Sequence, residues 1–246
     1  MKCPYDELYS QIDMSNRPFG YPVDYFLWRT AKLKGEVAKF INKDGKVLDV
    51  GGGTGIMVQF LPVHVKRKNY FNIDISIEML KYSAYNILAS AEQIPCPHNC
   101  FDYVILSEVL EHVGNKVAVL KECHRVFKPT GLFLLTTPRT GWIEDFKQSL
   151  FAPLIKLDGL VNHLLCGFSP RKPPLSIPEG IIDEPSDEKW LIEILKDIGF
   201  AILKQYRADN HVPWGRSGQS KFWRWFADKF IDPKKYGHCT VVISTK

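Results

Sequence analysis

KVLDVGGGTG, residues 46–55, is the stretch of sequence that decides the fold. Its VLDV part combines three apolar β-formers with one acid and predicts a short buried strand. The glycines that follow lack a Cβ atom, so the backbone can turn sharply there and press against a ligand. We expect a helix to begin near Gly55 and to run through Phe60, so that strand, turn and helix N-terminus form a platform of nucleotide size.

The glycines are spaced Gly-x-Gly-x-Gly, which is neither the pattern of dinucleotide folds nor that of phosphate loops. No Lys-Ser or Lys-Thr pair follows them, so no cation is placed for a triphosphate. Residues 70–74 read YFNID and predict a second strand that ends in Asp74. A carboxylate at the end of a second strand can accept both hydroxyls of a ribose, so Asp74 is a candidate ribose ligand.

These motifs, and others that follow them in order, resemble the class I S-adenosylmethionine-dependent methyltransferases. Residues 91–95 (AEQIP) resemble the adenine loop of that family, and residues 101–113 (FDYVILSEVLEHV) resemble its fourth strand and the motif after it. Residues 120–134 resemble the helix and fifth strand that close this half. The resemblance is good over residues 46–137 and weaker towards the C-terminus. It is nearest to the broad group that includes the ubiquinone and menaquinone biosynthesis methyltransferases.

The resemblance implies an α/β fold with a Rossmann-like sheet of seven strands, mostly parallel with an antiparallel last strand. Helices would cover both faces, and two insertions would interrupt the pattern. The alternation of expected strands and helices between residues 47 and 136 by itself favours a parallel sheet. Ligands of such sheets bind at the carboxyl ends of the strands, where the strand order reverses.

We expect one methyltransferase domain over residues 1–246. Its expected parts are a leader with an N-terminal helix (1–45), a cofactor-binding core (46–137), an apolar insertion (138–186), and a C-terminal half (187–246) that contains an aromatic and basic insertion (211–236). The apolar insertion follows the fifth strand and would lie beside the mouth of the active site. We therefore interpret it as a lid that forms the acceptor pocket.

The resemblance implies S-adenosylmethionine as the cofactor. Asp74 would accept the ribose hydroxyls, the glycine loop would let the backbone approach the methionine part, and Ala91 with its neighbours would border the adenine. Many relatives carry Asp at the position of Ser90, and Ser90 lacks that carboxylate. The residues expected to bind the cofactor are Asp49, Gly51, Gly52, Gly53, Asp74, Ile75, Ser90, Ala91, Glu92 and Ser107.

Methyl transfer from a sulfonium releases a neutral leaving group, so the protein mainly needs to align the acceptor and exclude water. A general base is needed only if the acceptor is a hydroxyl or an acidic carbon. The candidate bases are His112, Glu108 and, in the apolar insertion, His163. Because the Glu-His-Val stretch at His112 occurs across the family whatever the acceptor, a structural or cofactor-side role is favoured for this residue.

Composition favours a folded soluble protein, with 45% hydrophobic and 24% charged residues among 246. No apolar run approaches the roughly 18 residues of a membrane-spanning helix, and residues 1–7 lack the apolar core of a signal peptide. We therefore expect a cytoplasmic protein whose six cysteines are reduced. Cys96 and Cys100 are not accompanied by a second pair of metal ligands, so no metal site is predicted.

Most of the positive net charge lies between Arg207 and Tyr236. Within residues 214–230, aromatic side chains recur every four residues among basic ones, which allows three interpretations. The stripe could pack on the core, form a peripheral contact with lipid head groups or a lipid-like acceptor, or bind nucleic acid. Packing is favoured, and nucleic acid ranks lowest because the basic block is short.

The sequence as a whole favours an S-adenosylmethionine-dependent methyltransferase acting on a small molecule, and the apolar insertion favours an apolar or lipid-like acceptor. The alternatives are a protein or RNA methyltransferase and a non-catalytic binding protein on the same fold. No sequence feature specifies an oligomeric state.

Overall fold

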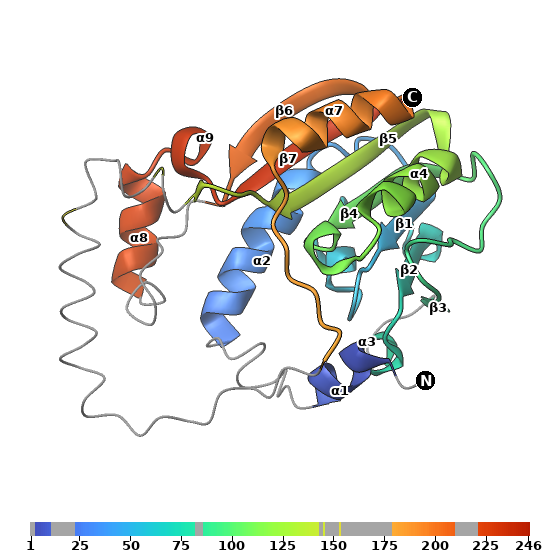
Figure 1. The fold of residues 1–246 in the computed structure, drawn as a ribbon, viewed down its shortest axis with the longest axis horizontal. Coiled ribbons are helices and arrows are strands. Elements are labelled where there is room, and N and C mark those ends of the chain that lie inside the picture. Colours follow the sequence, from blue (N-terminus) through green and yellow to red (C-terminus); the bar gives the residue numbers. More distant parts are fainter. Residues whose placement is uncertain are drawn as a thin grey trace.

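The computed structural model describes residues 3–10, 23–81, 86–142, 145, 153, 179–209 and 221–246. Its centre is a seven-stranded sheet in the order β3-β2-β1-β4-β5-β7-β6 (Figure 1). The strands are β1 (Val47–Val50), β2 (Tyr70–Asp74), β3 (Asn86–Leu88), β4 (Phe101–Ser107), β5 (Phe127–Pro138), β6 (Ala201–Ala208) and β7 (Cys239–Thr245). Strands β1 to β5 pair in parallel, and β7 is antiparallel to both β5 and β6. The predicted fold class is confirmed.

Helices cover both faces of this sheet. The longer ones are α2 (Val23–Ala38), α4 (Lys116–Val126), α7 (Glu188–Ile198) and α8 (Lys221–Phe230), and the short ones are α1 (Pro4–Ser10), α3 (Ile77–Leu80), α9 (Pro233–Tyr236) and the 3-10 turns η2 (Ile56–Gln59), η3 (Arg67–Asn69) and η4 (Leu110–His112). One apolar cluster joins α4 and α7 to alternate residues of the sheet, such as Val104 and Leu106. A second cluster joins the end of α2 to the intervening residues, such as Tyr103 and Ile105. This alternation is that of a sheet buried on both faces.

Helix α7 shows how local sequence sets the element boundaries. Asp187 caps its N-terminus, where the carboxylate accepts hydrogen bonds from the backbone N–H groups of Lys189 (3.0 Å) and Trp190 (2.9 Å). Gly199 ends the helix in the left-handed conformation (φ 110°), which a glycine adopts without a steric penalty. The amphipathic pattern of residues 187–199 predicts a helix that ends at Gly199, and the structure confirms it.

The sequence predicts a helix over residues 55–60 and a fifth strand over residues 132–136, and the structure differs at both. It also contains one helix that was not predicted. The helix expected from Gly55 to Phe60 is the 3-10 turn η2, because Gly55 is left-handed (φ 71°) and Pro62 cannot continue a helix. Strand β5 begins at Phe127 and not at Leu132, since Phe127 pairs with Phe101 beyond a register shift. The leader contains helix α1, which Pro4 begins at a position that suits proline.

Much of the two predicted insertions, 138–186 and 211–236, lies outside the residues that the structure describes. Of the apolar insertion, the structure describes residues 138–142, 145, 153 and 179–186, so the helix expected over 142–168 and His163 cannot be compared with it. In α8, Trp225 and Phe230 are 51% and 50% exposed and contact one another, with ring centroids 5.8 Å apart. The lipid-facing interpretation of residues 214–230 stays a prediction. None of the described helices is long and apolar enough to cross a membrane.

Candidate active site

A cavity of about 230 Å³ lies at the carboxyl ends of β1, β2 and β4. Six of the ten predicted cofactor residues line it, namely Gly51, Asp74, Ile75, Ser90, Ala91 and Glu92. Two of the three candidate bases, Glu108 and His112, line it as well. Residues far apart in the chain thus meet at the edge of the sheet where ligands of parallel α/β folds bind.

The glycine loop forms one wall of the cavity in a conformation that requires glycine. Gly51 and Gly53 have φ angles of 66° and 55°, which L side chains rarely adopt. A Cβ atom on Gly51 would lie 2.5 Å from Cγ2 of Val109, which is too close for any side chain. The loop is fixed from the neighbouring strand, since the backbone N–H of Gly51 donates to the carbonyl oxygen of Ile73 at 2.7 Å.

Asp74 ends β2 and connects it to the glycine loop. Its carboxylate accepts hydrogen bonds from the backbone N–H groups of Gly53 (2.9 Å) and Ser76 (2.8 Å). Burial raises the pKa of Asp74 above its usual range, although these two hydrogen bonds oppose the rise. The carboxylate has two oxygens and more lone pairs than these donors use, so it can accept further hydrogen bonds from a ligand in the cavity.

Two predicted cofactor residues, Asp49 and Ser107, lie outside the cavity lining with their side chains engaged elsewhere. Asp49 is 1% exposed, and its carboxylate accepts a hydrogen bond from the hydroxyl of Tyr70 at 2.7 Å. A Cβ on Gly52 would lie 2.6 Å from this carboxylate, so Asp49 supports the loop from beneath. The hydroxyl of Ser107 lies 2.8 Å from that of Thr136 on β5.

Gly52 and Gly53 are likewise absent from the cavity lining. Gly53 acts through its backbone, because its N–H donates to Asp74 and its carbonyl oxygen accepts from the side-chain amide of Asn72 at 2.8 Å. Both glycines therefore contribute by fixing the conformation of the loop, and they do not contact the cavity themselves.

The next part of the cavity lining, Ser90, Ala91 and Glu92, follows β3. The hydroxyl of Ser90 accepts a hydrogen bond from the backbone N–H of Glu92 at 3.1 Å, which makes a tight turn at Ala91. The carboxylate of Glu92 accepts from the backbone N–H of Asn115 at 3.1 Å. These bonds hold an open strip of backbone against the cavity, of the kind that a flat aromatic base can lie upon.

His112 faces the cavity in a fixed orientation. Its Nδ1 lies 2.8 Å from the carbonyl oxygen of Ile182. A carbonyl oxygen can only accept, so Nδ1 carries the proton and donates it. In the neutral ring Nε2 is then the acceptor, and it lies 3.9 Å from a carboxylate oxygen of Glu111. Burial and the charge of Glu108 raise the pKa of Glu111 well above its usual range, which favours its protonated form.

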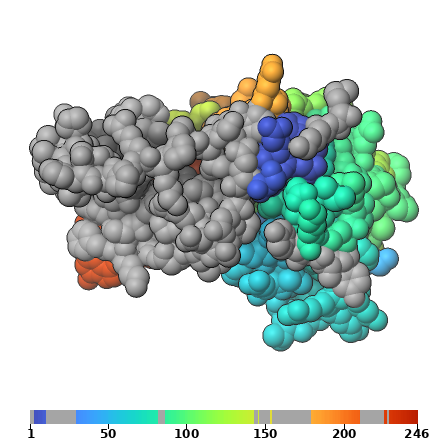
Figure 2. Space-filling view, turned by 90° about the horizontal axis from the view of Figure 1, so that it is seen from below, coloured from blue at the N-terminus to red at the C-terminus, as the bar shows by residue number. Residues whose placement is uncertain are grey.

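Two segments from distant parts of the sequence complete the lining of the cavity. We call their lining residues, Tyr5, Tyr9, Gly180 and Ile182, the roof. Tyr5 and Tyr9 of α1 line the cavity, and so do Gly180 and Ile182 from the segment that leads into α7 (Figure 1). The hydroxyl of Tyr5 donates to the carbonyl oxygen of His112 at 2.7 Å. Figure 2 shows α1 on the molecular surface, against the segment that follows β2.

Hydrogen bonds hold α1 in that place, and sequence reasoning predicted neither the helix nor its contacts. The carboxylate of Asp6 accepts from the hydroxyl of Ser76 (2.6 Å) and from the backbone N–H of Glu78 (3.2 Å). Two tyrosines four residues apart in the leader, Tyr5 and Tyr9, were the one available signal, because a helix places both on one face.

Comparisons with known proteins agree with this geometry. The methyltransferase domain family matches residues 48–135. The chain is 24% identical over 215 residues to the ubiquinone/menaquinone biosynthesis C-methyltransferase UbiE of Geotalea uraniireducens, across 82% of this chain and 88% of that protein. It is 29% identical over 149 residues to an uncharacterized methyltransferase of Schizosaccharomyces pombe, across 53% of this chain and 52% of that one.

Solved structures share the fold at low sequence identity. A SAM-dependent methyltransferase from Thermotoga maritima superposes with a TM-score of 0.56 at 16% identity, over 91% of this chain and 93% of that chain. A SAM-dependent methyltransferase from Archaeoglobus fulgidus superposes with a TM-score of 0.56 at 16% identity, over 90% and 99% of the two chains.

Proposed function

Because the protein belongs to the class I S-adenosylmethionine-dependent methyltransferases, we propose that it methylates a small, apolar molecule held under the roof of the cavity. S-adenosylmethionine supplies a methyl group on a sulfonium, and its departure leaves a neutral thioether. The protein therefore needs no group to stabilise a leaving anion, and its own contribution is alignment and the exclusion of water.

The residues of the cavity fit this cofactor. The carboxylate of Asp74 is half-buried, already oriented by two backbone N–H groups, and able to accept the hydroxyls of a ribose. The left-handed turn at Gly51 brings bare backbone to the cavity, where the methionine part would lie. Ser90, Ala91 and Glu92 would border the adenine, and Asp49 and Ser107 would act by supporting the loop and the end of β4.

We assign His112 a positioning role. Its Nδ1–H donates to the carbonyl oxygen of Ile182, and its own carbonyl oxygen accepts from the hydroxyl of Tyr5. His112 is therefore bonded to both segments of the roof. Glu108 also lines the cavity and stays the candidate base for an acceptor that must lose a proton.

The roof is the observation that carries the proposal of a small acceptor. Tyr5 and Tyr9 of α1 and Gly180 and Ile182 of the segment before α7 line the cavity. A base or side chain within a folded macromolecule would have to displace them, whereas a small apolar molecule can enter between them. The name of the UbiE relatives, which denotes C-methylation in quinone biosynthesis, supports an apolar ring as the acceptor.

The test is to incubate the protein and isotope-labelled S-adenosylmethionine with three fractions of a cell extract: apolar small molecules, polar small molecules and macromolecules. We expect label in the apolar fraction, with the product identified by its mass. Asp74→Ala should lose this activity and Glu193→Ala, a change of an exposed carboxylate on α7, should keep it. Label that appears chiefly in protein or RNA would contradict the proposal.

A further inference from the structure

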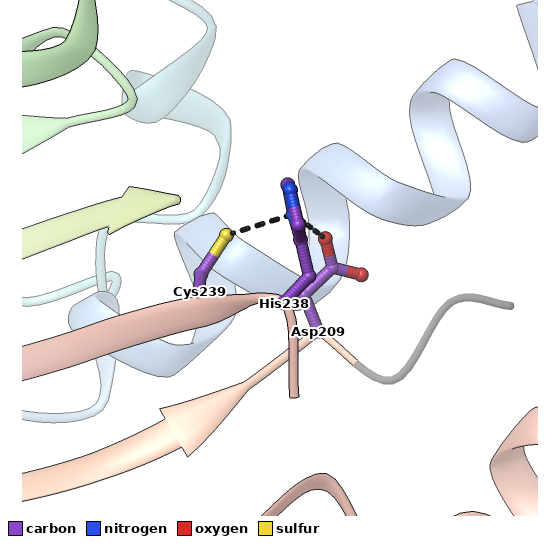
Figure 3. Close-up of side chains that lie close together, drawn as sticks. All are labelled: Asp209, His238 and Cys239. Carbon is purple, nitrogen blue, oxygen red and sulfur yellow. Dashed lines mark hydrogen bonds and ion pairs between the residues drawn. The ribbon is translucent and has the colours of Figure 1, made fainter. Parts of the chain in front are cut away.

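Three metal-binding side chains converge where β6 ends and β7 begins (Figure 3). Asp209 follows β6 directly, and His238 and Cys239 lead into β7. Two links hold the ends of these strands together: Cys239 pairs with Ala208 in the sheet, and the backbone N–H of His238 donates to the carbonyl oxygen of Asp209 at 2.9 Å. We propose that Asp209, His238 and Cys239 form a binding site for a single zinc ion.

The two distances from the imidazole within this cluster suit one tetrahedral ion. Nδ1 of His238 lies 3.4 Å from Sγ of Cys239 and 3.6 Å from Oδ2 of Asp209, and one ligand atom from each residue lies within 4.8 Å of the others. Zinc binds sulfur at about 2.3 Å and nitrogen or oxygen at about 2.0–2.2 Å, which places ligand atoms roughly 3.3–3.6 Å apart around a tetrahedral centre.

The orientation of the His238 imidazole also favours a metal cation, and not a single proton, between the three side chains. The same nitrogen, Nδ1, faces both the sulfur and the carboxylate (Figure 3). A single N–H can point at only one of them, and 3.6 Å is too long for a hydrogen bond. An ion between the three atoms would accept a lone pair from each at once.

Burial and charge favour a divalent ion. Cys239 is fully buried and Asp209 is 4% exposed, so a thiolate and a carboxylate would face the ion away from bulk water. Sγ of Cys239 lies 3.5 Å from both carboxylate oxygens of Glu108, to which the thiol donates when no ion is bound.

The ligand types select the metal. A thiol, an imidazole and a carboxylate together match zinc, whereas magnesium and calcium prefer oxygen ligands alone. Binding would release the proton of the Cys239 thiol to solvent, since the thiolate is the ligand. The indole of Trp142 packs edge-on against the imidazole of His238 with ring centroids 4.6 Å apart, which helps to fix the ring.

Three protein ligands leave a fourth position on a tetrahedral ion, which water would fill. The ion would fasten the ends of β6 and β7 to each other, next to Glu108 in the wall of the cavity. The site is defined without reference to the methyl acceptor, so its test does not depend on methyl transfer.

The test uses the full chain without an affinity tag, stripped of metals by a chelator and titrated with cobalt(II) as a coloured substitute for zinc. We expect one ion per chain, a thiolate-to-cobalt charge-transfer band in the near ultraviolet, and displacement of cobalt by zinc. His238→Gln and Asp209→Asn, which leave the buried thiol in place, should each weaken binding more than tenfold.

Two further variants locate the thiolate. Cys239→Ala should abolish the charge-transfer band, and Cys96→Ser, a change of a thiol far from this cluster, should leave both the band and the affinity unchanged. The proposal is overturned if wild-type protein gives no band, or if the band and affinity persist in Cys239→Ala or in both His238→Gln and Asp209→Asn.

Discussion

The backbone N–H of Gly53 donates to Oδ2 of Asp74 at 2.9 Å and so ties the loop after β1 to the acidic end of β2. The loop and the acid come from different strands, and neither would be oriented without the other. This contact turns two sequence motifs into one wall of a cavity. The proposed binding of the cofactor depends on this hydrogen bond between Gly53 and Asp74.

Asp74→Ala should weaken the binding of S-adenosylhomocysteine, the demethylated cofactor, by more than tenfold. The change removes hydrogen bonds from the ribose hydroxyls to a charged acceptor, each with a net contribution of roughly 1.5–3 kcal/mol. Calorimetric titration measures the affinity, and Glu193→Ala on the exposed side of α7 is the matched control. Equal affinities for the two variants would remove Asp74 from the cofactor site.

The same affinity should fall on acidification, and the fall should begin above the usual carboxylate range of about pH 4. Burial raises the pKa of Asp74 in the free protein, and the hydroxyls of a ligand favour its charged form. Lowering the pH through this raised pKa protonates the carboxylate and removes the acceptor. Asp74→Asn, which cannot titrate, should show a flat profile over the same range. Parallel profiles for both proteins would show that another group titrates.

Gly51→Ala should destabilise the protein by an amount on the order of 1–3 kcal/mol, because a Cβ would clash with Val109 and the positive φ would be strained. The matched control is Gly35→Ala in α2, where a Cβ meets nothing within 4 Å. That change should stabilise the helix by about 0.5–1 kcal/mol. Urea unfolding curves measure both free energies, and the same sign for the two variants would contradict the assigned loop geometry.

Much of the core could be predicted from the sequence because its signals are local. Apolar runs ending in glycine or in an acid set β1 and β2, and Asp187 with Gly199 set the ends of α7. The meeting of Tyr5 and Ile182 at His112 could not be predicted, since these residues come together only through the tertiary fold. The direction of the Ser107 side chain could not be predicted either, because its position at a strand end does not reveal the hydrogen bond with Thr136.

The zinc ligands escaped sequence reasoning for a related reason. The usual zinc signal is two pairs of ligands, each pair separated by two to four residues, and in this sequence only Cys96 and Cys100 come near it. Asp209 is distant in sequence from His238 and Cys239 and reaches them only through the antiparallel pairing of β6 with β7. Register across a sheet, and not spacing along the chain, assembles this cluster.

Tyr5→Phe should loosen α1 without unfolding the core. The change deletes one hydrogen bond, from the hydroxyl to the carbonyl of His112, and such bonds contribute about 0.5–1.5 kcal/mol. Hydrogen exchange over residues 3–10 should speed up by as much as about tenfold, and added S-adenosylhomocysteine should slow it again. Tyr206→Phe removes a similar bond, to Glu36, and should leave α1 unchanged. If α1 exchanges alike in wild type and Tyr5→Phe, this contact does not hold the roof.

The most direct measurement is a crystal structure of the protein with S-adenosylhomocysteine. We predict that both ribose hydroxyls lie within hydrogen-bonding distance of the Asp74 carboxylate, with the amino-acid end against the turn at Gly51. A ligand bound elsewhere, or one whose ribose faces away from Asp74, would contradict the account.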